Sequence, residues 1–137
     1  MREISPEELS KILKEHKRWC DTDEKEGEKA YLHKADLSNA NLSEANLSSA
    51  ILFQAGLSDA RLSGARLSRA NLSYAELIGA NLRGADLSEV LGLNIEQLGV
   101  MLTLYGAKLS LECRKQVKDE YPGLLEELVE EEEEEEE

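Results

Sequence analysis

The residues whose chemistry could support catalysis are few and scattered along the sequence. The chain of 137 residues has two histidines, His16 and His33, and two cysteines, Cys20 and Cys113. A serine or cysteine nucleophile needs a positioned base, and the many serines recur within a repeat that offers no such base. We therefore predict no catalytic residue, with both histidines structural or solvated.

The sequence also lacks the patterns that hold a cofactor or a metal. The glycines fall at repeat corners and helix ends rather than in a phosphate-binding loop. Cys20 and Cys113 have no partner at the spacing of a zinc knuckle or a redox motif. We expect two reduced structural thiols, as is typical of a cytoplasmic protein, with no cofactor and no metal.

The formal net charge of −13 is concentrated in one part of the chain. Residues 1–29 carry 7 Lys/Arg and 9 Asp/Glu (−2), residues 30–89 carry 5 and 6 (−1), and residues 90–137 carry 4 and 14 (−10), including eight consecutive glutamates from Glu130. No basic patch indicates nucleic-acid binding, and no apolar run is long enough for a signal peptide or a membrane span. We expect a cytoplasmic protein that binds neither nucleic acid directly nor a membrane.

The middle of the chain is built from a repeat of five residues. Alanine recurs at every fifth position from Ala30 to Ala85, and leucine follows two residues later from Leu32 to Leu87, giving twelve units without an insertion. A period of five smears leucine around an α-helix and alternates it between the faces of a flat strand. Equal environments for all the leucines require the chain to turn equally at each unit, which predicts a solenoid with the leucines inside.

Units such as ADLSN, ANLSE, ANLSS, ANLSY and ADLSE resemble the tandem repeats of the pentapeptide-repeat family, over residues 30–89. The resemblance implies an all-β solenoid, a right-handed four-sided β-helix with four units per coil. The coils would be 30–49, 50–69 and 70–89. The small alanines are expected at the inner corners. The predicted structural core is formed by twelve leucines: Leu32, Leu37, Leu42, Leu47, Leu52, Leu57, Leu62, Leu67, Leu72, Leu77, Leu82 and Leu87.

A solenoid needs caps, because its ends expose apolar side chains and unpaired strand edges. Residues 1–29 are predicted to form a capping helix and a linker, with Ser5 as N-cap, Pro6 at the first helical position and Glu8 completing a capping box. An apolar face at helical spacing is expected to cover the first coil. Its members are Leu9, Ile12, Leu13, His16, Trp19 and Cys20.

The register of the repeat fails at Val90, and residues 90–129 are predicted to form a second helical cap. Asn94 and Ser110 suit the N-caps of two helices. The apolar residues expected to form the cap core are Leu98, Met101, Leu102, Leu104, Val117, Leu124 and Leu125. A partner-binding helix is the alternative. Residues 107–111, AKLSL, resemble a further pentapeptide out of register, and the glutamate tail 130–137 is expected to fray or to be disordered.

One face of the predicted rod departs from the polar pattern. Ile51 and Phe53 stand where other units carry Asn and Ser, and the square coil would align them with Tyr31 and Tyr74. These four residues are the candidate interaction patch. A flanking segment could fold back over it, or it could contact a partner or a second subunit.

These observations favour a non-enzymatic structural or protein-interaction module whose partner is an unknown protein or another copy of the chain. The family resemblance also implies an alternative function, a DNA-mimicking inhibitor or protector of DNA gyrase or another topoisomerase. A near-neutral repeat region that carries Arg61, Arg66, Arg69 and Arg83 argues against mimicry. Three coils would also span only about 14 Å, less than half a turn of DNA.

Overall fold

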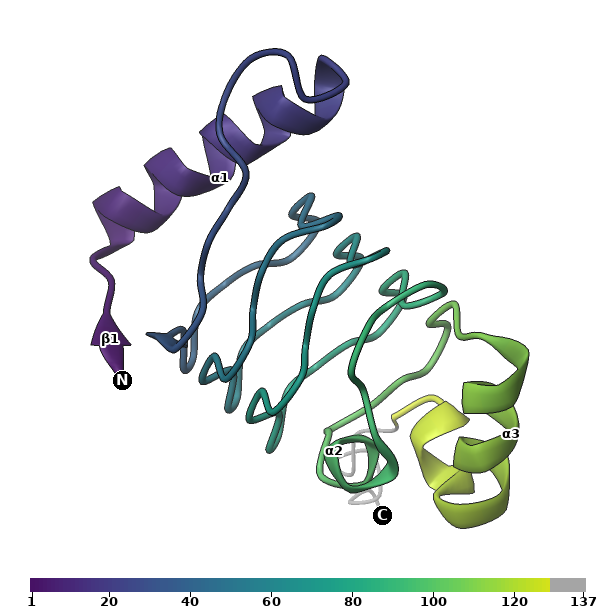
Figure 1. Cartoon of the computed structure of the whole chain (residues 1–137). Coiled ribbons are helices and arrows are strands. Elements are labelled where there is room, and N and C mark those ends of the chain that lie inside the picture. The colour runs from purple at the N-terminus through teal and green to yellow at the C-terminus, as the bar shows by residue number, and fades with distance from the viewer. Residues whose placement is uncertain (129–137) are drawn as a thin grey trace, which may run out of the picture.

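The computed structural model describes residues 1–128 of the chain. It is a short rod of stacked coils with helices at both ends (Figure 1). The regular elements are β1 (Arg2–Glu3), α1 (Pro6–Asp21), β2 (Ala35–Asp36), α2 (Ile95–Gly99), α3 (Leu111–Glu120) and the 3₁₀ turn η1 (Pro122–Leu125). The rest of the repeat region is a right-handed β-helix. On most of its sides, one residue of each unit forms a parallel β-bridge to one residue of the next coil.

Parallel pairing with a step of 20 residues defines the coils. Tyr31 pairs with Ile51, and Ile51 pairs with Asn71, and three further columns follow the same step. The ladder hydrogen bonds are short, for example 2.9 Å from Leu52 N to Asn71 O. The four sides of the coils are called faces 1 to 4, and they contain the units that begin at residues 30, 35, 40 and 45 and at every twentieth residue thereafter.

A tight turn separates consecutive units and produces the equal rotation that the period requires. In the unit at residues 50–54, Ala55 N donates to Leu52 O at 3.0 Å, and Gln54 between them has a φ of 57°. A left-handed residue at the third turn position is what a type II turn requires. Gly64 and Gly79 take this position without the steric cost that a side chain brings.

The twelve predicted leucines form the interior, each no more than 2% exposed. Each contributes about 1.5–3 kcal/mol by its burial. The corner alanines are buried as well, except Ala40 and Ala45 of the first coil, which are half-buried. Outside, Asn or Asp accepts a hydrogen bond from the backbone two residues on, as in the 3.1 Å contact from Ser48 N to Asn46 Oδ1.

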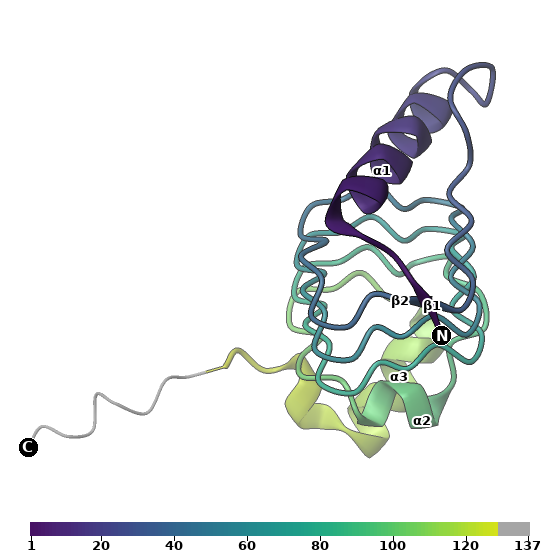
Figure 2. The ribbon, with the colours of Figure 1, turned by 90° about the vertical axis from the view of Figure 1, so that its left-hand side faces the viewer.

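The N-terminal segment covers the first coil by a helix and a strand. Figure 2 shows α1 running across the open end of the coils. Ser5 caps α1 by accepting from Glu8 N at 3.0 Å, although the reciprocal bond of a capping box is not formed within residues 1–128. In addition, Arg2–Glu3 pairs in parallel with Ala35–Asp36, a strand that the sequence analysis did not predict.

The parallel ladder continues beyond residue 89 into the C-terminal segment. Leu91 pairs with Asn71 at the usual step. The helix α2 then replaces the next strand, after which Thr103 pairs with Asn81 and Lys108 with Asp86, 22 residues on rather than 20. The AKLSL segment is thus in structural register, and two additional residues explain why it is out of register in the sequence.

The predicted helices of the C-terminal segment are present. Asn94 caps α2 with both bonds of a capping box, and Ser110 caps α3 by accepting from Cys113 N. No helix among residues 1–128 combines the length and apolarity needed to cross a bilayer. The prediction for the glutamate tail 130–137 lies outside the described residues.

Candidate interaction surface

The buried side chain of His16 connects the N-terminal helix α1 to the first coil through two hydrogen bonds. His16 is fully buried; its Nδ1 accepts from Ala30 N at 2.9 Å, and its Nε2 lies 2.8 Å from Ser48 O. Since the Ala30 N–H can only donate, the ring proton is on Nε2 and is donated to Ser48 O. Burial lowers the pKa of His16, and the nearby Lys29 charge lowers it further, against the effect of the Ser48 bond.

Among the other groups with reactive potential, Cys20 contacts His16, with 3.6 Å between Cys20 Sγ and His16 Nε2, whereas His33 and Cys113 lie elsewhere on the molecule. His33 is exposed on face 1. Cys20 lies at the end of α1 and Cys113 in α3, at opposite ends of the rod (Figure 1), and both are free thiols. Burial raises the pKa of each thiol, which disfavours the reactive thiolate.

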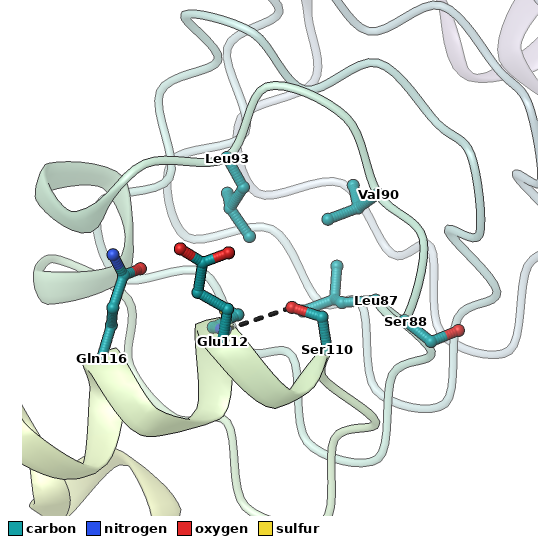
Figure 3. Close-up of a pocket in the computed structure, with 8 residues that line it drawn as sticks. Leu87, Ser88, Val90, Leu93, Ser110, Glu112 and Gln116 are labelled. Carbon is teal, nitrogen blue, oxygen red and sulfur yellow. Dashed lines mark hydrogen bonds between the residues drawn. The ribbon is translucent and has the colours of Figure 1, made fainter.

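A cavity of about 290 Å³ lies between α3 and the chain that leaves the third coil (Figure 3). Leu87, Val90 and Leu93 supply its apolar wall, and Glu112 and Gln116 project into it from α3. The hydroxyl of Ser110, at the edge of the cavity, is the N-cap of α3 and accepts the hydrogen bond drawn as a dashed line in Figure 3. Within residues 1–128, no group of three His, Cys, Asp or Glu side chains could hold a metal.

The structure aligns the candidate patch along face 1. Tyr31 and Ile51 are paired on adjacent coils, which places their side chains next to each other. Phe53 projects from the same unit as Ile51, and its ring meets that of Tyr74 edge to face at a centroid distance of 5.7 Å. The four residues are therefore brought together by the coil register.

Much of this patch is open to solvent in the part of the chain that the structure describes. Tyr31 is 57% exposed and Tyr74 73% exposed, whereas Ile51 and Phe53 are half-buried by their neighbours. The flanking residues 1–29 reach the patch at Tyr31, where Arg2 Nη2 donates to Tyr31 O at 2.9 Å and Lys29 Nζ lies 6.0 Å from the ring centroid. The aromatic rings are thus available for contact.

Two parts of this surface were missed by the sequence analysis. Leu91, 54% exposed, continues the column of Tyr31, Ile51 and Asn71 into the next coil. The sequence does indicate this continuation, because Val90 stands where a further unit would have its alanine and Leu91 stands at the outward position that follows. The half-buried Trp19, with Lys29 5.6 Å from its ring centroid, adjoins the other end, a contact with no sequence signal.

Comparison with known proteins supports the fold. A family model described as pentapeptide repeats (8 copies) matches residues 30–69 and again residues 50–89. No curated protein sequence matches the chain. The solved structure of trypsin-treated QnrB1, described as a plasmid-mediated fluoroquinolone resistance protein, is similar at a TM-score of 0.52 and 22% identity, covering 73% of this chain and 45% of that one.

A second solved structure is a pentapeptide-repeat protein, Rfr23, from the cyanobacterium Cyanothece 51142. It is 37% identical at a TM-score of 0.42, covering 57% of this chain and 58% of that one. The chain thus spans less than half the length of QnrB1 and somewhat over half that of Rfr23. The repeat match and the paired coils agree on residues 30–89, and this segment is a pentapeptide-repeat region.

Proposed function

We propose that the chain is a non-enzymatic, cytoplasmic protein-interaction module that uses face 1 as its contact surface. The observation that carries the proposal is the alignment of Tyr31, Ile51, Phe53 and Tyr74 on one face of the rod, whereas the other three faces of the repeat units 30–89 expose a single large apolar residue, Ile78. A regular solenoid tolerates Asn and Ser at these positions, as its other faces do, so folding does not require the apolar residues. Contiguous exposed apolar surface is typical of interaction sites.

The rigidity of the scaffold supports this role. Face 1 is part of a backbone ladder, so a partner would meet a surface that loses little conformational freedom on binding. Tyrosine adds a large contact area and a hydroxyl, and aromatic residues often dominate binding energy at interfaces. We further propose three complete coils and a partial fourth, with α1 and the C-terminal helices protecting the two ends from edge-to-edge association.

The gyrase-directed alternative is not favoured. The likeness to QnrB1, at 22% identity, concerns the fold alone. Four coil levels give a repeat rod of about 19 Å, short of the ~34 Å of one DNA turn. Arg61 and Arg66 are exposed on faces 3 and 4, where a DNA mimic would carry acids. Potent inhibition in a gyrase supercoiling assay would nevertheless favour the alternative.

The experiment compares the double variant Ile51→Asn, Phe53→Ser with wild type. Both new residues are typical of these positions, so the far-UV circular dichroism is expected to be unchanged. We expect the variant to lose a partner captured from native host extract, or self-association measured by sedimentation. The matched control, Asn41→Asp with Ser43→Asn, changes the same two positions of a unit on face 3. Unchanged stability, oligomeric state and binding in the patch variant would contradict the proposal.

A further inference from the structure

The middle coil carries three arginines on faces 3 and 4 of the rod. Arg61 forms a backbone β-bridge with Asn81 on face 3, and Arg66 forms one with Asp86 on face 4. The two arginines therefore hold the same position on adjacent faces. Arg69 ends the face 4 unit that contains Arg66. All three side chains are exposed. These residues, 61, 66 and 69, are called the arginine surface.

Acids on the next coil balance part of the charge of the arginine surface, because Glu89 pairs with Arg69 and Asp86 holds the place next to Arg66. Residues 60–69 contain three arginines and no acid. Arg69 forms an exposed ion pair with Glu89 at 3.4 Å, whereas Arg61 and Arg66 form no ion pair with any residue in the range 1–128. The helix α3, in contrast, balances three Lys/Arg with three Asp/Glu.

The chain returns to this side of the rod just before the glutamate tail begins. Leu104 N on the last coil donates to Leu124 O of η1 at 2.8 Å. Two residues after η1, Glu127 Oε2 accepts from Arg83 Nη2 at 3.2 Å. Arg83 lies on face 3 one coil beyond Arg61, and Figure 2 shows the yellow segment after α3 beside the coils.

We propose that the arginine surface binds an acidic peptide segment, and that its occupant is the chain's own glutamate tail, residues 130–137. Three observations carry the inference: eight negative charges follow directly in sequence, Arg61 and Arg66 form no ion pair within residues 1–128, and the Arg83–Glu127 pair starts the same contact. Eight extended residues span about 26 Å. The arginine surface lies one coil, about 4.8 Å along the axis, from the coil of Arg83, so the tail can reach it.

Tethering makes the contact effective despite the weakness of each exposed ion pair. A single exposed pair contributes about 0–1 kcal/mol, but a short tether holds the tail at an effective concentration in the millimolar range. The contact is therefore expected to form at low ionic strength and to weaken as salt screens it. Any partner with an acidic segment would have to displace the tail.

The test uses the full-length chain and a fluorescein-labelled octaglutamate peptide in about 20 mM NaCl, where screening is weak. Three variants are compared with wild type. The first replaces all eight tail glutamates with glutamine, which keeps the length. The second adds Arg61→Gln, Arg66→Gln and Arg69→Gln to the first. The third adds instead Lys11→Gln, Lys14→Gln and Lys25→Gln, which removes the same charge from exposed residues at the other end of the rod.

We expect the tail-neutral chain to bind the peptide more tightly than wild type, by a factor of one plus the ratio of the tail's effective concentration, in the millimolar range, to its dissociation constant. The arginine variant should lose this binding, and the lysine control should keep it. Equal binding by wild type and the tail-neutral chain would overturn the proposal, as would binding that survives loss of the arginines. Sedimentation of wild type as a salt-sensitive dimer would overturn it too, by assigning the surface to the tail of a second copy.

A second measurement avoids reliance on the arginine variants. The Nε–H resonances of Arg61 and Arg66 should differ between wild type and the tail-neutral chain in about 20 mM NaCl, and the difference should disappear in about 500 mM NaCl, where the Debye length is only a few Å. Resonances that coincide at both salt concentrations would contradict the contact.

Discussion

Replacing His16 with alanine removes the polar connection between α1 and the first coil. The ring is fully buried, accepts from Ala30 N and donates to Ser48 O, and stacks on Trp19 at a centroid distance of 5.4 Å. Alanine leaves the Ala30 N–H without a partner in a buried place. Cys20 Sγ, 3.7 Å from Ser48 O, can still donate weakly to the carbonyl. The unpaired Ala30 N–H is therefore expected to cost more stability than the weakened contact to Ser48 O.

The magnitude follows from these contacts. An unsatisfied buried donor costs about 1–3 kcal/mol, and the lost packing of the ring adds about 1 kcal/mol. We expect α1 to detach more easily by about 2–4 kcal/mol, which corresponds to roughly 30- to 1,000-fold faster exchange of the Ala30 amide when exchange follows local opening. The amide of Ala50, bonded to Leu47 O within the β-helix, should change much less.

The pH dependence has a defined sign. The folded protein keeps His16 neutral because its pKa is lowered by burial, whereas the unfolded chain takes up a proton near its ordinary pKa. The unfolded state therefore binds more protons, and the contribution of His16 to stability is complete above about pH 6.5. It falls as pH decreases, by at most about 1.4 kcal/mol per pH unit, until the folded-state pKa is reached.

Native-state hydrogen exchange and urea unfolding between about pH 5 and 8 test the prediction, with His33→Ala as the control for an exposed histidine on the same coil. The stability difference between wild type and His16→Ala should shrink on acidification. Unchanged protection of the Ala30 amide in the variant, or a difference that is constant with pH, would refute the assigned hydrogen bonds.

Three further predictions concern the coils and the C-terminal cap. Leu57→Ala, in the fully buried interior of the middle coil, should lower the free energy of unfolding by about 2–5 kcal/mol in urea titrations, with Ser58→Ala as the surface control. Ala60→Leu should destabilise by at least about 1–3 kcal/mol in thermal unfolding, since the alanine is fully buried at a corner; a neutral result would mean that the corner has unused space. Gln97→Glu should lose the two bonds that Gln97 Nε2 donates to Leu72 O and Ala75 O, at 2.8 and 3.0 Å, and destabilise by about 1–3 kcal/mol each at neutral pH. Stability of the glutamate variant equal to wild type in urea would contradict that geometry.

The repeat region was predictable because its period admits one solution. Each leucine has the same neighbours in sequence, so a uniform turn is required, and the burial of Leu32 through Leu87 follows. The patch on face 1 could be located for the same reason, because residues that are 20 positions apart in the sequence lie next to each other on adjacent coils. Its function as a contact surface stays a prediction.

The ends were less predictable because their contacts lack a period. The two-residue strand Arg2–Glu3 has no apolar alternation, and its pairing depends on an open edge at Ala35–Asp36 that only the fold reveals. The ladder beyond Val90 was missed because two extra residues and α2 hide the step from Asn81 to Thr103. His16 was placed correctly on the covering helix face, but its hydrogen bonds to the backbone of the coil have no sequence signal.

Site-specific photocrosslinking tests the role of face 1 most directly. A benzophenone amino acid replaces Phe53 in one sample and, in the control, Ser63, which holds the same place of a unit on face 3. If face 1 is the contact surface, irradiation in native host extract yields a discrete intermolecular adduct from position 53 and none from position 63. Equal adducts from both positions, or a crosslink from position 53 only to another segment of the same chain, would contradict it.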